Sequence, residues 1–224
     1  MKGDLYVIIE TPDSRSEVTL SHAVSKEESI CSTYFLFPKQ KDFVDLPCSQ
    51  WQWEDRQFNF EVSESKEINK WFLFLSNTVD LADQIEAIIS LLEENKSLSL
   101  SRIITFINSN VLINLNVELR NWLDACAHFS DVFCFSGRKN NNSNLIKQIT
   151  DRYESLHYPL ETYILGERKA PPINRILSSI PKRISHVFDP PEILEPDDHP
   201  QNDPFLAQQP NGKRKVGIPN PFKN

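Results

Sequence analysis

Residues 5–19, LYVIIETPDSRSEVT, decide the expected fold, because an apolar run leads through a turn into a helical pattern. Residues 5–9 are continuously apolar and rich in β-branched side chains, which is typical of a strand buried on both faces. Residues 11–14 (TPDS) favour a turn and a helix cap, and residues 16–25 have modest helical spacing. The chain is therefore predicted to begin with strand, loop and helix, and the stretch ETPDSRSEV contains no glycine and no lysine.

The alternation of strands and helices continues to about residue 165. Strands separated by helical patterns of about 10–15 residues indicate βαβ units, whose right-handed crossovers place helices on both faces of a parallel sheet. The predicted fold class is α/β, a mostly parallel sheet with helices on both faces. Further strands are predicted at residues 31–37, 58–62, 71–75, 103–107, 132–135 and 160–165, further helices at residues 81–92, 118–129 and 145–156, and an irregular stretch at residues 39–53.

The composition limits the classes of function. The 224 residues are 39% hydrophobic and 25% charged, as in ordinary globular proteins. A formal net charge of −7 argues against general nucleic-acid binding, which needs clustered cations. No window holds the roughly 18 apolar residues of a membrane span, so no membrane partner is expected. Cys31, Cys48, Cys126 and Cys134 lack metal-ligand and disulfide spacing, which favours a reduced, cytoplasmic protein.

The chain divides into two predicted regions, a domain of residues 1–167 and a C-terminal tail of residues 168–224. Eleven of the 15 prolines lie in the tail, and its composition predicts a proline-rich, extended and partly disordered segment. One interpretation lays the tail across the domain, and its apolar contacts are then Ile176, Leu177, Ile184 and Phe188. The other makes the tail a docking arm that binds another protein through Phe205, Leu206 and Phe222.

Three segments in order carry a family resemblance: WFLFLSNTVDLADQIEAI (residues 71–88), SRIITFINSNVL (101–112) and NWLDACAHFSDVFCFSGR (121–138). Their order resembles that of the CobW-like P-loop GTPases, a family that includes metal-insertion chaperones. The matching residues are Leu81-Ala82-Asp83 and Ser130-Asp131-Val132, and the resemblance covers roughly residues 5–165. It implies a three-layer domain like that of P-loop NTPases.

The phosphate loop of that family, G-x-x-G-x-G-K-T-T, falls on residues 10–18. Its glycines let backbone N–H groups wrap phosphate, and its lysine neutralises phosphate charge. This chain has Glu10, Asp13 and Arg15 at glycine positions, Ser16 at the lysine and Glu17 at the magnesium-binding hydroxyl. Three carboxylates repel a triphosphate, and side chains do not replace the missing glycine conformations.

The other family motifs also depart from the pattern. The guanine-reading Asn-Lys-x-Asp falls on Ser136-Gly137-Arg138-Lys139, so lysine replaces the aspartate that pairs with the base. In the strand-end segment the glutamate falls near Asn77, the glycine near Asp80 and the proline at Gln84. The metal-associated Cys-x-Cys-Cys motif is missing, and Cys48 is the lone cysteine nearby. The resemblance therefore predicts a degenerate CobW-like P-loop GTPase, a pseudo-GTPase.

The favoured hypothesis is a non-catalytic domain that binds another protein through its tail and uses no cofactor and no metal. One alternative is a nucleotide-dependent hydrolase with an altered phosphate loop, in which Ser14, Arg15 and Ser16 bind the nucleotide and Arg15 supplies the cation. A second alternative is a metal-delivery protein.

Three further features have a structural and a functional interpretation. His128 ends an apolar helix and is expected to be a hydrogen-bonded structural histidine, with metal binding as the alternative. Asp80 and Asp83 suit a helix cap and a first helical turn better than an acid pair. Residues 51–60, WQWEDRQFNF, are expected to form an ordered loop on the sheet, with an aromatic docking surface around Arg56 as the alternative.

Overall fold

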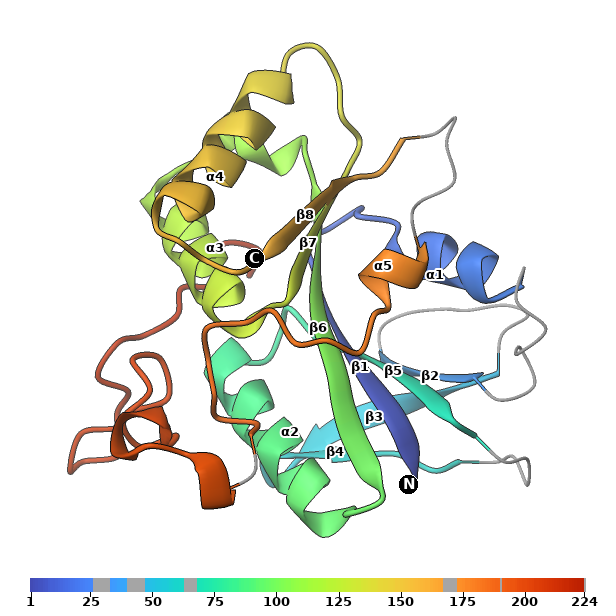
Figure 1. Ribbon diagram of the computed structural model, residues 1–224, viewed down its shortest axis with the longest axis vertical. Coiled ribbons are helices and arrows are strands. Elements are labelled where there is room, and N and C mark those ends of the chain that lie inside the picture. Colours follow the sequence, from blue (N-terminus) through green and yellow to red (C-terminus); the bar gives the residue numbers. More distant parts are fainter. Residues whose placement is uncertain (26–32, 40–46, 63–67, 167–172, 190, 224) are drawn as a thin grey trace.

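The computed structural model describes residues 1–25, 33–39, 47–62, 68–166, 173–189 and 191–223 (Figure 1). The strands are β1 (Gly3–Glu10), β2 (Thr33–Pro38), β3 (Cys48–Glu54), β4 (Gln57–Asn59), β5 (Lys70–Phe74), β6 (Leu98–Asn108), β7 (Val132–Ser136) and β8 (Glu161–Ile164). The α-helices are α1 (Ser16–Ser25), α2 (Leu81–Glu94), α3 (Val117–Phe129), α4 (Ser143–Ser155) and α5 (Ile173–Ile176). Short 3₁₀ turns are η2 (Val111–Asn114), η3 (Pro191–Ile193) and η4 (Pro196–Asp198).

The strands form one sheet in the order β4-β3-β2-β5-β1-β6-β7-β8. Every pairing is parallel except that of β3 with β4. β1 lies inside the sheet, between β5 and β6, so its carboxyl end stands beside theirs. The predicted fold class, a mostly parallel α/β sheet with helices on both faces, is confirmed (Figure 1).

The alternation of side chains along β1 divides the core into two layers. Leu5, Val7 and Ile9 enter the core beneath α2, α3 and α4, whereas Tyr6 and Ile8 enter the core beneath α1 and α5. All five are buried, because successive side chains of a strand point to opposite faces and both faces are covered by helices. This explains why residues 5–9 are continuously apolar instead of alternating.

Capping side chains begin two of the helices that cover the first face. Asp80 accepts hydrogen bonds from the backbone N–H groups of Ala82 and Asp83, at 2.9 and 3.2 Å, so the predicted cap is confirmed. Asn116 accepts one from the N–H of Leu119 at 2.8 Å and begins α3. These caps fix where the helices start, and therefore which residues stand at the carboxyl edge of the sheet.

The expectation of an irregular stretch at residues 39–53 was wrong where the structure describes it, because β3 occupies Cys48–Glu54. Residues 40–46 lie outside the described residues. β3 lies second from the end of the sheet, between β4 and β2, and Trp51 is the residue it buries fully, so its apolar signal is short. Trp51 donates from Nε1 to the carbonyl of Phe74 at 2.9 Å. The expectation of an ordered loop on the sheet over residues 51–60 was also wrong, because β3 and β4 form a hairpin that is part of the sheet.

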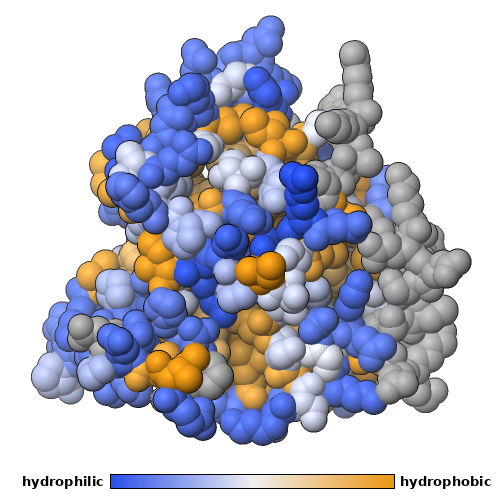
Figure 2. All heavy atoms as spheres, viewed as in Figure 1, coloured by the Kyte–Doolittle hydropathy of each residue, from blue (hydrophilic) through white to orange (hydrophobic). Residues whose placement is uncertain are grey.

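The C-terminal tail lies against the domain (orange to red in Figure 1). Ile176, Val187, Leu206 and Ile218 are buried in the two cores, with exposed fractions of 0, 4, 2 and 8%. The first tail residues, 168–172, lie outside the described residues, so the division at residue 167 stays a prediction. Figure 2 shows mostly polar side chains on the face in view, with apolar side chains between them.

Among the described residues, none of the helices combines the length and the apolar character that a membrane span requires.

Candidate functional site

The loop between β1 and α1 is closed by its own side chains. The carboxylate of Glu10 accepts hydrogen bonds from the hydroxyls of Ser14, at 3.2 Å, and Ser16. Both serines are buried, with exposed fractions of 2 and 0%. The hydroxyls that begin the helix are therefore directed at a carboxylate of the same loop.

The backbone of this loop is clamped to two neighbouring strands. The N–H of Thr11 donates to the carbonyl of Phe106 at 2.9 Å, and Thr11 Oγ1 accepts from the N–H of Asn108 at 2.8 Å. Asn77, which follows β5, donates from Nδ2 to the carbonyl of Glu10 at 3.1 Å. The loop is thus held from both sides at the carboxyl edge of the sheet.

Two loop residues adopt a backbone conformation that favours glycine. Asp13 and Arg15 both have φ of 56°, in the left-handed region where a side chain costs roughly 1–2 kcal/mol. They stand at two of the positions that the family resemblance assigns to glycine. The loop therefore has glycine-like backbone angles at these positions without the glycines.

A hollow of about 480 Å³ opens at this loop. Its lining includes the carboxylate residues Glu10, Asp13 and Glu17 and a single cationic residue, Arg15, which is exposed. Opposite charges attract and like charges repel with energies of about 1–4 kcal/mol at 4 Å near a protein surface. The predicted nucleotide ligands Ser14, Arg15 and Ser16 thus lie together, but beside three carboxylates, and the hydroxyls of the two serines donate to Glu10.

Residues 136–139, the segment at the position of the guanine-reading motif, are held by hydrogen bonds within their own loop. Gly137 has φ of 64°, and Asn142 donates from Nδ2 to its carbonyl at 3.1 Å while accepting from the N–H of Lys139 at 2.7 Å. Asn142 is fully buried, whereas Arg138 and Lys139 are exposed. This corner therefore presents two cations and, at the position of the base-pairing aspartate, no carboxylate.

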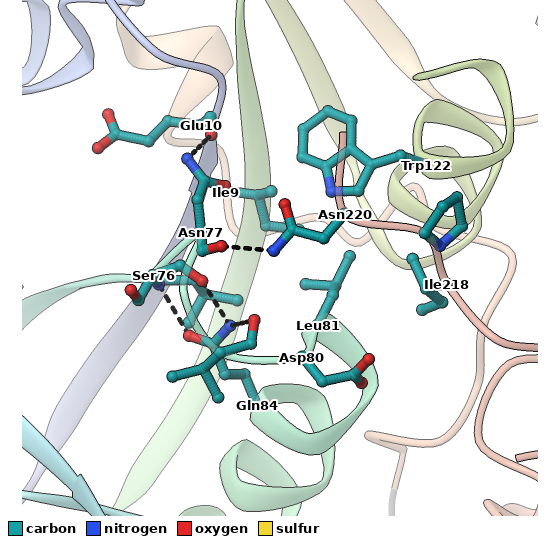
Figure 3. A pocket seen from close by; sticks show the side chains of 13 residues that line it. Ile9, Glu10, Ser76, Asn77, Asp80, Leu81, Gln84, Trp122, Ile218 and Asn220 are labelled. Carbon is teal, nitrogen blue, oxygen red and sulfur yellow. Dashed lines mark hydrogen bonds between the residues drawn. The ribbon is translucent and has the colours of Figure 1, made fainter. Parts of the chain in front are cut away.

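A crevice at the carboxyl ends of β1 and β5, called here the edge crevice, is bordered by Ile9, Leu81 and Trp122 (Figure 3). Parallel α/β sheets bind their ligands at this edge. Here the tail fills it with residues 218–220, and Asn220 lies between Asn77 and Trp122. The remaining cavity of about 20 Å³ has room for roughly one water molecule.

The three predicted partner anchors pack against the domain. Leu206 is 2% exposed, and the ring of Phe205 lies 5.2 Å from that of His128. Phe222 meets Trp122 edge-on at 5.0 Å between ring centroids. A role in binding a separate protein stays a prediction, and it requires these side chains to leave their present positions.

His128 belongs to a buried polar cluster that joins the tail to α3. Its Nε2 lies 2.6 Å from Oδ2 of Asp203, which also accepts from the hydroxyl of Ser185 at 3.0 Å. Burial raises the pKa of Asp203, but the hydrogen bonds from His128, the N–H of Phe205 and Ser185 outweigh it, so the pKa lies below its ordinary value. The expected hydrogen-bonded histidine is present, whereas Asp203 was missed because it lies 75 positions away.

Both aspartates that carry the family resemblance bind arginines of the tail. Arg214 donates to Asp83 at 2.6 Å and to both carboxylate oxygens of Glu86 at 2.5 and 2.6 Å. The hydrogen bonds and charges of Glu86 and Asp83 raise the pKa of Arg214, against an opposing effect of burial. Asp131, fully buried, accepts from the guanidinium of Arg183 at 3.3 Å. Sequence spacing gave no signal for these pairs, because the tail carries no repeating pattern.

A larger hollow of about 620 Å³ lies between α2 and the tail. Ile89, Leu92 and Phe188 contribute apolar surface, and Glu93 and Lys96 stand on its rim. Its charged lining is mostly acidic, with Glu93, Asp189 and Glu192 against Lys96, so this hollow does not favour an anion.

Among the described residues, no group of three or more His, Cys, Asp or Glu side chains is placed to hold a metal ion. Cys126 and Cys134 are buried, and burial raises the pKa of both thiols well above the ordinary value, which keeps them protonated at neutral pH. Cys48 is half-buried, and Cys31 lies outside the described residues.

No protein-family model matches the sequence, and no curated protein matches it. Among solved structures, the chain is similar to a Zn(II)-bound YjiA GTPase from E. coli, with a TM-score of 0.51 and 8% identity. The similarity covers 80% of this chain and 62% of that one. A Zn(II)-bound triple mutant of YjiA aligns with a TM-score of 0.44 and 8% identity over 75% of this chain and 58% of that one. The first likeness shows a P-loop-GTPase-like α/β fold, in agreement with the resemblance in element order.

Proposed function

We propose that this chain is a GTPase-like domain that has lost nucleotide binding and acts by binding another protein. The observation that carries the first half is the closure of the β1–α1 loop. Glu10 accepts hydrogen bonds from the buried hydroxyls of Ser14 and Ser16. A carboxylate of the protein itself therefore binds the side chains at the start of α1.

The charge of the loop supports the same proposal. A phosphate loop stabilises a triphosphate with backbone N–H groups and a lysine. Here Ser16 stands at the lysine position, and the hollow is lined by Glu10, Asp13 and Glu17. Each carboxylate that faces a phosphate opposes binding, and the exposed cation Arg15 offsets only part of this repulsion.

The occupied edge crevice supports the second half. The carboxyl edge of the sheet, where ligands of this fold class bind, holds a polypeptide segment of the chain itself, residues 218–220. A surface shaped for polypeptide suits a protein-binding role better than a small-molecule one.

One observation favours the alternative of an altered nucleotide hydrolase. Arg15 is exposed at the rim of a hollow of about 480 Å³, beside Ser14. A phosphate that approached from solvent would meet this guanidinium first.

Isothermal titration with GTP, ATP and their magnesium complexes distinguishes the two functions. The wild-type protein is expected to give no binding heat up to millimolar nucleotide. Micromolar binding that disappears in Arg15→Ala would overturn the proposal, and nucleotide turnover that is lost in the same variant would establish the alternative. The matched control is Arg56→Ala, because Arg56 is also exposed and also has a positive φ, of 60°. Stoichiometric metal in protein purified without chelator would instead favour metal delivery.

A further inference from the structure

We propose that the edge crevice is a peptide-binding groove, which residues 214–222 of this chain fill in cis. The partner is a separate protein that carries an extended segment of the same chemistry: an arginine, then four positions later an apolar residue followed by Pro-Asn-Pro and an aromatic residue. This inference rests on the proposed protein-binding function and names the kind of partner.

At the apolar end of the groove, the tail is held by side-chain contacts and does not add a strand to the sheet. Ile218 is 8% exposed, and Asn220 donates from Nδ2 to the carbonyl of Asn77 at 2.5 Å. Oδ1 of Asn220 also accepts from the N–H of Phe222 at 3.1 Å, a local turn that orients the aromatic ring. That ring meets Trp122 edge-on at 5.0 Å. An apolar residue, an asparagine and an aromatic residue are thus each recognised separately.

The other end of the groove is acidic. Arg214 donates to Asp83 and Glu86 of α2, and to the carbonyl of Leu206 at 2.7 Å. Its side chain is 13% exposed, and those of the two carboxylates are 31 and 33% exposed. A partly buried arginine that bridges two carboxylates requires a cation at this position of any competing segment.

The connection between the two ends is loosely held beyond Lys215, whose N–H donates to the carbonyl of Ala207 at 2.8 Å. Val216 is 47% exposed, and a side chain added at Gly217 would meet nothing within 4 Å. Residues 215–220 form no helix or strand. The side-chain contacts of Arg214 and Phe222 can therefore be released while the backbone bridge between Gln208 and Arg214 stays in place, and a partner segment can take the place of residues 216–222.

Prolines at positions 219 and 221 suit the segment to this mode of binding. Each fixes its own φ and restricts the residue before it, so less conformational entropy is lost on binding. Because residues 214–222 are covalently attached to the domain, their effective concentration at the groove is of roughly millimolar order. Wild-type protein is consequently expected to bind an external segment weakly until the cis anchors are loosened.

The test uses the full-length chain and a fluorescent peptide that copies residues 213–223, KRKVGIPNPFK. Fluorescence anisotropy compares the wild type with the double variant Arg214→Ala/Phe222→Ala, in which the cis segment lacks its two anchors. The double variant is expected to bind the peptide at least tenfold more tightly. Adding Asp83→Asn and Glu86→Gln to it is expected to weaken binding at least tenfold, and so is an Arg214→Ala change in the peptide.

Circular dichroism and thermal melting verify that each variant is folded, and the single variant Phe222→Ala replaces the pair if the pair unfolds. A folded, loosened variant that ignores the peptide, or that binds a scrambled peptide equally well, overturns the proposal. A concentration-dependent dimer of the wild type in which tails are exchanged would also overturn it, by assigning the groove to a second copy. If the variants bind the peptide as expected but the protein also binds nucleotide, the proposed loss of nucleotide binding is wrong and the proposed peptide-binding groove is retained.

Discussion

Two corners at the carboxyl edge of one sheet are closed in different ways. The β1–α1 loop is closed by residues within six positions of one another, because Glu10 accepts from Ser14 and Ser16. The edge crevice is closed by Asn220, which binds Asn77 from 143 positions away. Closing a short loop loses little chain entropy, whereas the distant closure orders a long segment and must be supported by many contacts.

The difference predicts which corner matters for the stability of the whole chain. The side-chain contacts of Glu10 with Ser14 and Ser16 are local, so their removal is expected to have a small effect that stays near the loop. The anchors of the tail, such as Asp203 and Arg214, connect α2 and α3 to a segment that contributes buried side chains to the core. Their removal is expected to have a larger effect over a wider area.

The largest effect is expected for Asp203→Ala. This change leaves His128 and Ser185 buried without their acceptor, together with the N–H groups of Phe205 and Leu206. Loss of about 2–4 kcal/mol of unfolding free energy is expected, measured by urea denaturation. The control Glu192→Ala, at an exposed acidic residue of the same tail, should change it by less than about 0.5 kcal/mol. Equal effects of the two changes would show that the tail anchor is dispensable.

Acid is expected to weaken the same anchor. The pKa of Asp203 is lower in the folded protein than its ordinary value of roughly 3.9. Its contribution to stability is therefore present above that value and is lost as the pH falls through the folded pKa. The difference in urea midpoint between wild type and Asp203→Asn is expected to be larger at pH 5 than at pH 3. A difference that grows toward pH 3 would contradict the assignment of Asp203 as the ionised member of the cluster.

A smaller and more local effect is expected at the loop. Glu10→Ala removes the acceptor of two buried hydroxyls and should lower the unfolding free energy by about 1–2 kcal/mol. Amide hydrogen exchange should accelerate in residues 10–19, with little change in α3. Asp13→Asn is the control, because Asp13 is exposed and asparagine tolerates its φ of 56°. Accelerated exchange throughout the tail after Glu10→Ala would remove the distinction between the two corners.

The elements that sequence predicted well are those with a strong and continuous period. The apolar runs of β1, β5 and β6, and the stripes of α2, α3 and α4, each mark buried faces over several residues. β3 was missed because Trp51 is its one fully buried residue, so a strand of polar composition resembles a loop. Hydrophobic periodicity reports burial, and a strand with a single buried side chain gives little periodic signal.

The residues of the candidate site also divide into those that the sequence predicted and those that it did not. The departures at Glu10, Asp13 and Arg15 were visible in the sequence, because they fall within six positions of one short motif. The partners of Asp83 and His128 were not visible, because a single arginine or aspartate in a proline-rich tail carries no signal of what it contacts. Local chemistry can be predicted from adjacent residues, whereas long-range pairing needs the folded arrangement.

The smallest effect is expected for Arg15→Gly, and it concerns the backbone of the local closure. Arg15 has φ of 56°, and its carbonyl accepts from the N–H and the hydroxyl of Thr19, both at 3.1 Å. Glycine relieves roughly 1–2 kcal/mol of left-handed strain but adds about 0.4–1 kcal/mol of entropy to the unfolded chain. A net gain of about 0.5 kcal/mol in unfolding free energy is expected relative to Arg15→Ala, which removes the same side chain and keeps Cβ. If the glycine variant is instead the less stable of the two, the left-handed angle at Arg15 is not a strained feature of the loop, and the glycine-like backbone no longer links this loop to a phosphate-binding one.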